Sequence, residues 1–145
     1  MAEFGYNEPQ TINGGASAIL NDMIPCPKGY VLHRAGSGIL TLRGIVNGPC
    51  GRFARYRVAY NGNIAIPAGG TAGEIQVGLA IGGEIVPISI AAATPTVAEA
   101  YWNVGKSLII DVPAGGYYTV SLDNATVDNA PILLRNLNVE VTRLA

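Results

Sequence analysis

The chain has 145 residues, a length that predicts a single domain. Only 13% of the residues are charged and 49% are hydrophobic, and nine Lys and Arg residues against ten Asp and Glu residues give a formal net charge of -1. This balance provides no basic field for nucleic acid or an anionic membrane, and no apolar run reaches the ~20 residues of a membrane span. Monomers rarely expose large apolar patches, so the low charge predicts that other subunits cover part of the surface.

The first fifteen residues are polar and rich in Gly and Asn, which predicts an N-terminal arm (1–15) followed by one domain (16–145). Three spaced apolar side chains, Phe4, Tyr6 and Ile12, are candidate anchors of this arm on another protein. The N-terminus shows neither the basic region nor the apolar core of a signal peptide, so we expect synthesis in the cytoplasm.

Residues 16–24 are expected to form the first strand, although the alternation of apolar side chains is imperfect there. Better alternation predicts strands at 39–46 and 52–60. Asn61-Gly62 is a strong hairpin signal and predicts a tight turn before a strand at 63–66.

The clearest strand is Ile75–Ile81, in which apolar residues alternate with small or polar ones. Gly82-Gly83 tolerates positive φ at both central turn positions and predicts a hairpin leading to a second strand, 84–90. The small residues Gly78 and Ala80 leave room for something to lie close to the outer face of this hairpin.

Beyond this hairpin, Thr94-Pro95 predicts the start of a short helix, with Trp102 just after it. The remaining segments read as strands at 108–112, 117–122 and 132–144, with a polar loop at 123–131. Regularly spaced short strands with turn signals predict an all-β fold, an antiparallel jelly-roll β-sandwich.

Catalytic candidates are weak. His33 is a possible general base, but no Ser or Cys nucleophile stands in a recognisable strained turn, so a loop histidine is the preferred interpretation. The acidic residues are scattered and lack the paired spacing of glycosidases. We therefore expect a protein that is not an enzyme and needs no cofactor.

Two segments are candidate ion sites. Arg52, Arg55 and Arg57 suit phosphate or carboxylate, but Arg55 and Arg57 share one strand face, and a solvated or interface face explains them without a ligand. Residues 123–129 are rich in oxygen ligands, so calcium is conceivable, but the regular pattern of a calcium loop is missing and a polar turn is preferred.

The two cysteines, Cys26 and Cys50, each adjoin a proline. They are either a disulfide or two free thiols, and the expected cytoplasmic synthesis favours free thiols. With only His33 in addition, they offer too few ligands for a metal site. The aromatic pair Tyr101 and Trp102 suits either a sugar-stacking site or an interface or core position, and we prefer the latter.

Several segments resemble small β-rich proteins from the structural gene regions of bacteriophages of Gram-positive hosts. The resemblance spans roughly residues 17–145. It is carried by the Gly82-Gly83 hairpin and by the segments 26–31, 36–40, 57–67, 94–95, 101–104, 110–116 and 137–143. The strand order and the segment Val112-Pro113-Ala114-Gly115-Gly116-Tyr117-Tyr118 are also similar to the trimeric jelly rolls of the tumour-necrosis-factor and complement type, in which a Tyr-rich strand packs near the threefold axis.

These resemblances imply a structural protein of the virion, placed on the capsid surface as a homotrimeric decoration protein bound to the major capsid protein. Tyr101, Trp102, Tyr117 and Tyr118 are then the expected trimer-interface residues. The alternative is the head domain of a phage fibre that binds a receptor or a host-surface glycan. Decoration predicts an arm that grips the shell, whereas receptor binding predicts a ligand pocket at the loop tips.

Overall fold

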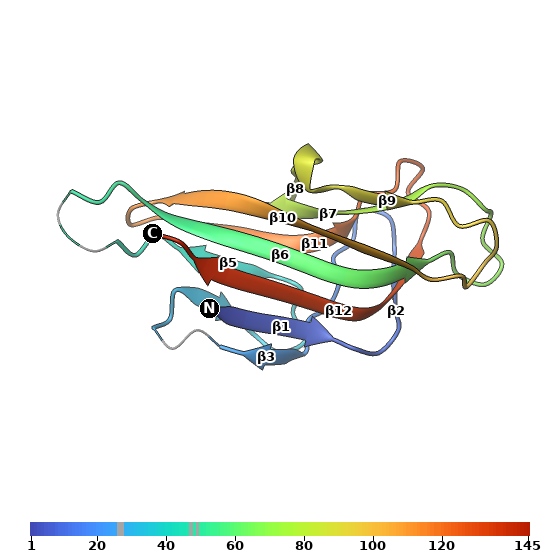
Figure 1. Cartoon of the computed structure of the whole chain (residues 1–145), viewed down its shortest axis with the longest axis horizontal. Coiled ribbons are helices and arrows are strands. Elements are labelled where there is room, and N and C mark those ends of the chain that lie inside the picture. Colours follow the sequence, from blue (N-terminus) through green and yellow to red (C-terminus); the bar gives the residue numbers. More distant parts are fainter. Residues whose placement is uncertain (26–27, 47, 49) are drawn as a thin grey trace.

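The computed structural model describes residues 1–25, 28–46, 48 and 50–145, and its strands form two sheets (Figure 1). The strands of sheet A are β1 (Ala2–Tyr6), β2 (Gln10–Ile12), β3 (Asp22–Ile24), β6 (Phe53–Ala65), β10 (Trp102–Pro113) and β12 (Ile132–Arg143). Those of sheet B are β4 (Val31–His33), β5 (Leu40–Arg43), β7 (Ile75–Ile81), β8 (Glu84–Ile85), β9 (Ala91–Ala93) and β11 (Tyr117–Asn124).

Both sheets are antiparallel, which confirms the jelly-roll-like β-sandwich expected from the sequence. Sheet A has the order β10-β6-β12-β1-β3, with β2 also paired to β12. Sheet B has the order β4-β5-β11-β7-β8, with β9 also paired to β7. The helical element of the described residues is a single 3-10 turn, Pro87–Ser89 (η1), and no helix in them is long and apolar enough to cross a membrane.

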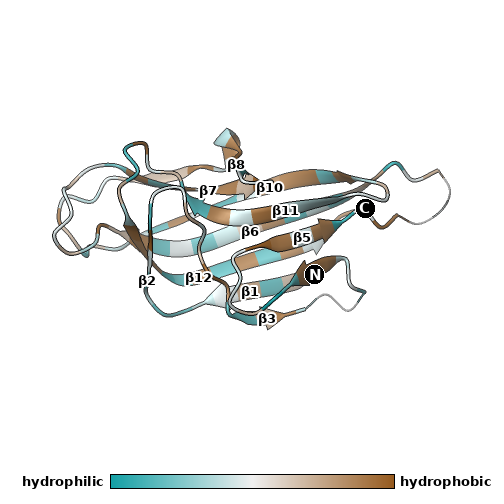
Figure 2. Cartoon of the chain, turned by 180° about the vertical axis from the view of Figure 1, so that it is seen from behind, coloured by the Kyte–Doolittle hydropathy of each residue, from teal (hydrophilic) through white to brown (hydrophobic). Residues whose placement is uncertain are grey.

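The core lies between the two sheets and follows from the period of two along each long strand. In β6 the even-numbered residues Tyr56, Val58 and Tyr60 are buried, and the odd-numbered ones from Phe53 to Asn63 are exposed or half-buried. Leu79 of β7 and Val141 of β12 are buried in the same core. Figure 2 shows the result as apolar and polar bands that alternate along the strands.

The predicted N-terminal arm is wrong, because residues 2–12 belong to sheet A. β1 lies between β12 and β3 and is paired with both, and β2 pairs with the start of β12. Phe4 and Ile12 are each only 2% exposed and are part of the core, while Tyr6 is half-buried. Few apolar residues suffice here because alternation buries one face of the strand and its two neighbours supply the main-chain hydrogen bonds. The predicted boundary before residue 16 therefore falls inside one folded unit.

The predicted strand at 16–24 is reduced to β3, because this segment passes from one sheet to the other. The backbone N–H of Ala18 donates to the carbonyl of Leu122 in sheet B, at 2.8 Å. The N–H of Leu20 donates to the Ser37 carbonyl, and Asp22–Ile24 then pairs with β1 in sheet A. The change of sheet explains why the alternation of this segment is imperfect.

The predicted hairpin at Asn61-Gly62 is also wrong, because β6 continues through it. Neither residue has the positive φ of a tight hairpin turn, and β6 pairs with β10 on one side and β12 on the other. The irregularity falls instead on β12, where Asn136 has a φ of 54° and the register shifts between Arg135 and Asn138. Pairing on both sides therefore overrides the local turn signal.

The central Gly82-Gly83 hairpin is confirmed, with φ values of 61° and 88°. Its second strand is much shorter than the predicted 84–90, because β8 ends at Ile85 and η1 follows. The segment then folds back over Gly78, where an added Cβ would lie 3.1 Å from side-chain carbons of Ile85 and Ile90. The room that Gly78 leaves is thus filled by the chain itself.

The predicted helix after Thr94 does not form. Glu99 has a φ of 62°, which a right-handed helix excludes, and its N–H donates to the Ile66 carbonyl. Trp102 pairs with Ile64 and begins β10, which is therefore longer than the predicted strand at 108–112. Pairing of β10 with the edge of β6 thus overrides the helix-start signal of Thr94-Pro95.

The predicted polar loop at 123–131 begins two residues later, because Asp123 and Asn124 end β11 and are buried. Asp123 accepts hydrogen bonds from the hydroxyls of Ser17 and Ser121, at 2.7 and 2.8 Å. The Asn124 side chain donates to the carbonyls of Ile12 and Ala130 and accepts from the Thr126 N–H. These groups hold the loop to the sandwich, as the polar-turn interpretation expects.

Replacing Asn124 with Ala should strongly destabilise the fold. The change removes three hydrogen bonds at a site only 1% exposed, so we expect a loss of about 2–4 kcal/mol in the free energy of unfolding. Urea denaturation measures this loss. Asn21→Ala, at an exposed position, is the control and should change stability by less than about 0.5 kcal/mol. Equal effects of the two substitutions would contradict the structural role of Asn124.

A second prediction concerns the pH dependence of stability that Tyr60 causes. Burial raises the pKa of Tyr60 from 10.0 to about 12. Its hydroxyl donates to the Ser89 carbonyl at 2.6 Å and so ties η1 to the core. Since the folded protein holds this phenol neutral at a pH where the unfolded chain ionises it, its contribution to stability is complete below pH 10 and lost as the pH rises towards 12.

Denaturation at several pH values tests this assignment against Tyr60→Phe, which retains the other tyrosines. Between pH 9 and 11.5 the wild type should lose about 1–2 kcal/mol more stability than the variant. Parallel losses in the two proteins would show that Tyr60 does not carry this alkaline dependence.

Candidate functional site

The loops at one end of the sandwich enclose a cavity of about 450 Å³. They join β6 to β7 (residues 66–74) and β11 to β12 (residues 125–131), at the right-hand end of Figure 1. Small residues make up much of the wall, and the carboxyl-bearing side chains are Glu74 and Asp128. We call this cavity the loop-end pocket.

Both walls of the loop-end pocket are anchored to the core. Ile66 and Ile75 are buried where the first loop leaves β6 and enters β7. Within that loop, Gly69 has a φ of 80° and the Gly70 N–H donates to the Pro67 carbonyl, which closes a tight turn. The second loop is held by the buried Asn124 network described above.

The chemistry of the pocket is that of a hydrogen-bond acceptor. Its lining, among the described residues, includes two carboxylates and no cation. The Gln76 amide donates to Glu74, which fixes the position of that carboxylate beside the opening. A ligand with several hydroxyl or amino groups would match such a lining.

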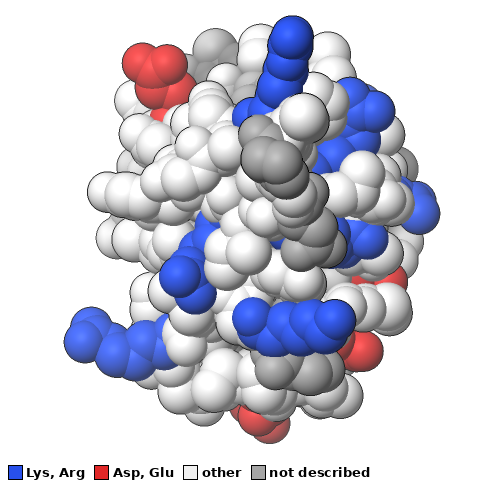
Figure 3. Space-filling model, turned by 90° about the vertical axis from the view of Figure 1, so that its left-hand side faces the viewer, with Lys and Arg blue, Asp and Glu red and all other residues white. Residues whose placement is uncertain are grey.

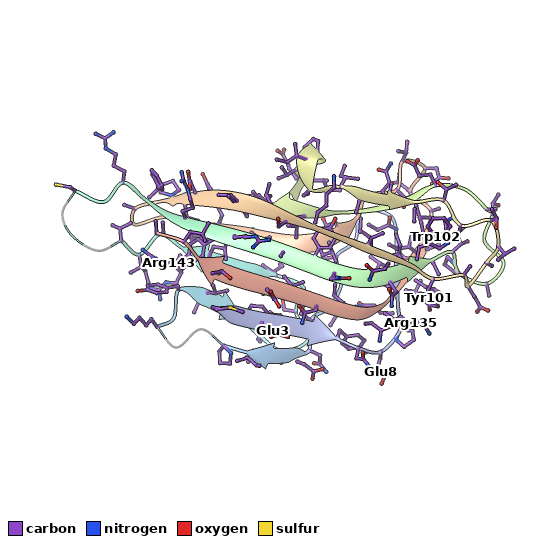
Figure 4. All side chains as sticks on the ribbon, in the orientation of Figure 1. Glu3, Glu8, Tyr101, Trp102, Arg135 and Arg143 are labelled. Carbon is purple, nitrogen blue, oxygen red and sulfur yellow. The ribbon has the colours of Figure 1, made fainter. Side chains whose placement is uncertain are left out.

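Tyr101 and Trp102 lie at the same end of the molecule as the pocket (Figure 4). The Arg135 guanidinium lies 3.8 Å from the centre of the Tyr101 ring, and Trp102 is 50% exposed. Tyr117 and Tyr118 lie beyond the other end of β10, whose twelve residues span roughly 40 Å at ~3.3 Å per residue. The structure therefore does not bring the four predicted interface aromatics into one cluster.

The outer face of sheet A carries a feature that the sequence analysis missed, a ladder of asparagine side chains. We call it the asparagine ladder (Asn7, Asn61, Asn63, Asn103 and Asn136). Amide groups link Asn103 to Asn61 at 2.7 Å and to Asn63 at 3.2 Å, Asn63 to Asn136 at 3.1 Å, and Asn136 to Asn7 at 2.7 Å. The ladder crosses β10, β6 and β12 and reaches the turn after β1.

The surface next to the ladder includes several small side chains. Gly105 and Ser107 of β10, Ala59 of β6 and Gly5 of β1 all face outward there. Asn138 and Glu140 of β12 line a hollow of about 370 Å³ beside Ala59. We refer to this surface, together with the asparagine ladder, as the sheet A face.

The sequence contains a signal for this face in the spacing of its asparagines. Asn61 and Asn63 are two residues apart, as are Asn136 and Asn138, and such spacing places side chains on one face of a strand. A hairpin at Asn61-Gly62 would place Asn61 and Asn63 in different elements, so the spacing was not interpreted as one face. A prediction of one long strand would have placed both asparagines on the same face.

The other candidate residues have structural contacts. His33 ends β4, its ring packs edge-on against Phe4 with centroids 5.0 Å apart, and Nε2 lies 2.8 Å from the Ser37 carbonyl. These contacts suit the loop-histidine interpretation. Among the described residues no group of three or more His, Cys, Asp and Glu side chains is placed to hold a metal ion.

Arg55 pairs with Asp111 across β6 and β10 through two hydrogen bonds, at 2.7 and 3.0 Å. The hydrogen bonds from Arg55 hold the pKa of the exposed Asp111 carboxyl below its ordinary value. Cys50 is an exposed thiol, but Cys26 lies outside the described residues, so the expectation of two free thiols stays a prediction.

Comparison with known proteins identifies the fold and no family. No family model matches the chain, and no curated protein matches it. Among solved structures, the chain is similar to the globular domain of a zebrafish complement 1qA protein, with a TM-score of 0.53 and 10% sequence identity over 97% of this chain and 96% of that one. At this identity the likeness shows the fold alone, a sandwich of the complement C1q type.

Proposed function

We propose that the protein is a non-enzymatic homotrimeric head on the surface of a bacteriophage particle, and that it binds a ligand through the loop-end pocket. The phage setting comes from the resemblance of its segments to phage structural proteins. The ligand class that the pocket chemistry favours is a hydroxyl-rich molecule such as a host-surface glycan.

The observation that carries this proposal is the position of the pocket. A cavity of about 450 Å³ lies at the loop tips, as expected for a receptor-binding head. Residues 1–15 do not form the capsid-gripping arm expected for a decoration protein, since Phe4 and Ile12 are core residues of the sandwich. Of the two functions considered from the sequence, receptor binding therefore has the stronger geometric support.

The proposed trimer uses the sheet A face. Its small side chains allow a neighbouring backbone to approach closely, and the asparagine ladder supplies donors and acceptors for it. The adjoining edge strand β10 is twelve residues long, exposes Ile109 at 60%, and carries only Lys106 and Asp111 as charges. Such an edge is prone to uncontrolled pairing unless it is covered, and a second copy of the chain would cover it.

Ala59→Arg should dissociate the trimer, because a long charged side chain on the sheet A face keeps the neighbouring subunit away. We expect the wild type to sediment as three chains and the variant as one, with at least about a tenfold weaker association. Thr41→Arg places the same side chain on the outer face of sheet B and should leave the trimer intact. A monomeric wild type, or dissociation by both substitutions, would contradict the assignment.

Ligand binding should be lost when the pocket is filled. Thr71→Trp adds a large ring to the wall of the loop-end pocket, whereas Ala35→Trp adds one to the turn after β4. Labelled protein is applied to cells of Gram-positive bacteria, and bound protein is measured by flow cytometry. We expect bound wild type and Ala35→Trp, and little Thr71→Trp, with all three sedimenting alike. Binding that survives Thr71→Trp would exclude the pocket as the ligand site.

Capsid decoration remains the second candidate, favoured by the low charged share of the chain and by the resemblance to phage structural proteins. Its partner would be the major capsid protein. Co-sedimentation with undecorated capsids distinguishes the two functions, because a decoration protein pellets with them whether or not the loop-end pocket is filled.

A further inference from the structure

The positive charge of the protein is concentrated at the end opposite the loop-end pocket. Six of the nine Lys and Arg residues lie there: Lys28, Arg43, Arg52, Arg55, Arg57 and Arg143. Two carboxylates lie among them. Asp111 is paired with Arg55, and the C-terminal carboxylate belongs to Ala145, whose backbone is hydrogen-bonded to that of Arg55. Figure 3 shows this end, with the blue side chains spread across it and the red ones near its margin. We call it the basic end.

Two guanidinium groups of the basic end, those of Arg55 and Arg143, lie against aromatic rings, and that of Arg43 donates to the Gly29 carbonyl. Arg143 lies 4.3 Å from the centre of the Tyr30 ring and 5.9 Å from that of Tyr56, and Arg55 lies 5.1 Å from that of Phe53. The Tyr56 hydroxyl donates to the Arg43 carbonyl at 2.5 Å, which fixes the end of β5. Groups that are already oriented lose little entropy when they bind.

One donor at this end is unsatisfied. The Nη1 atom of Arg143 is buried and has no hydrogen-bond partner among the described residues. Buried donors in folded proteins nearly always have a partner, so this nitrogen is short of an acceptor. An approaching carboxylate would supply one after a small movement of the side chain.

Exposed aromatic rings lie between the cations. Tyr117, which pairs with Arg43, is 68% exposed, and Tyr118 and Phe53 are partly exposed beside it. Five arginines and one lysine with Tyr and Phe form the residue mixture typical of protein interfaces, where Arg and aromatic side chains are enriched and Lys is depleted.

We infer that the basic end is a docking surface for an acidic protein surface. Nucleic acid is the less favoured partner, because the whole chain has a net charge of -1 and three acidic side chains, Glu74, Glu99 and Asp128, occupy the opposite end. Long-range attraction to a polyanion is therefore weak, and local recognition of carboxylates by oriented arginines dominates. The inference is independent of the loop-end pocket, which lies at the other end of the long strands.

The test uses the purified protein in its native assembly state and poly-L-glutamate as the probe. Binding is measured by fluorescence anisotropy at low and physiological salt, against a single-stranded DNA oligonucleotide of similar charge. We expect poly-L-glutamate to bind more tightly than the DNA. We also expect the double substitution Arg43→Gln/Arg52→Gln to weaken its binding by about tenfold, since two lost charged contacts of ~0.7 kcal/mol each correspond to that factor.

The control is Arg34→Gln, which removes a cation outside both the basic end and the β10 edge and should leave binding within about twofold of the wild type. No binding of poly-L-glutamate, tighter binding of DNA, or an equal loss in Arg34→Gln and in the double variant would overturn the inference. Loss of pocket-dependent cell binding in Arg43→Gln/Arg52→Gln is not expected, so the outcome is distinguishable from failure of the proposed function.

Discussion

The pairing of β6 along its whole length is the constraint on which the rest of the structure depends. All thirteen residues lie beside β10 on one side, β12 on the other, or both. Its even-numbered side chains form the centre of the core, and the odd-numbered residues Ala59, Asn61 and Asn63 form the middle of the sheet A face. Because a one-residue slip would exchange these two sets, this register also fixes where β10 and β12 present their outward residues.

The pairing of β6 also explains why some strand predictions from the sequence were correct and others were wrong. Segments whose apolar residues alternate cleanly, such as Ile75–Ile81 and 132–144, were placed correctly, as was the Gly82-Gly83 turn. Asn61-Gly62 was misread because turn propensity is local, whereas the two neighbouring strands come from residues 102–143. Pairing between residues so far apart leaves no trace in a short window of sequence.

The prediction of an N-terminal arm was wrong for a related reason. The polar composition of residues 1–15 predicted that they do not pack against the domain. Ala2, Phe4 and Ile12 are nevertheless enough to complete the core, because β12 and β3 supply main-chain partners. This difference also bears on the expected function. Phe4 and Ile12, which were expected to anchor a partner, are buried in the sandwich. The spacing of short strands and turn signals correctly predicted the all-β class, but it could not place the edges of the sheets.

The candidate surfaces divide along the long axis of the sandwich. Turns rich in small residues form the loop-end pocket, and Glu74, Asp128 and Glu99 make that end acidic. The opposite end gathers arginines from β5, β6 and β12, which are far apart in the sequence, so the net charge of -1 concealed them. The sheet A face lies between the two ends. A trimer formed through that face would set three pockets at one end and three basic surfaces at the other, so one assembly would bind partners of opposite chemistry without competition between them.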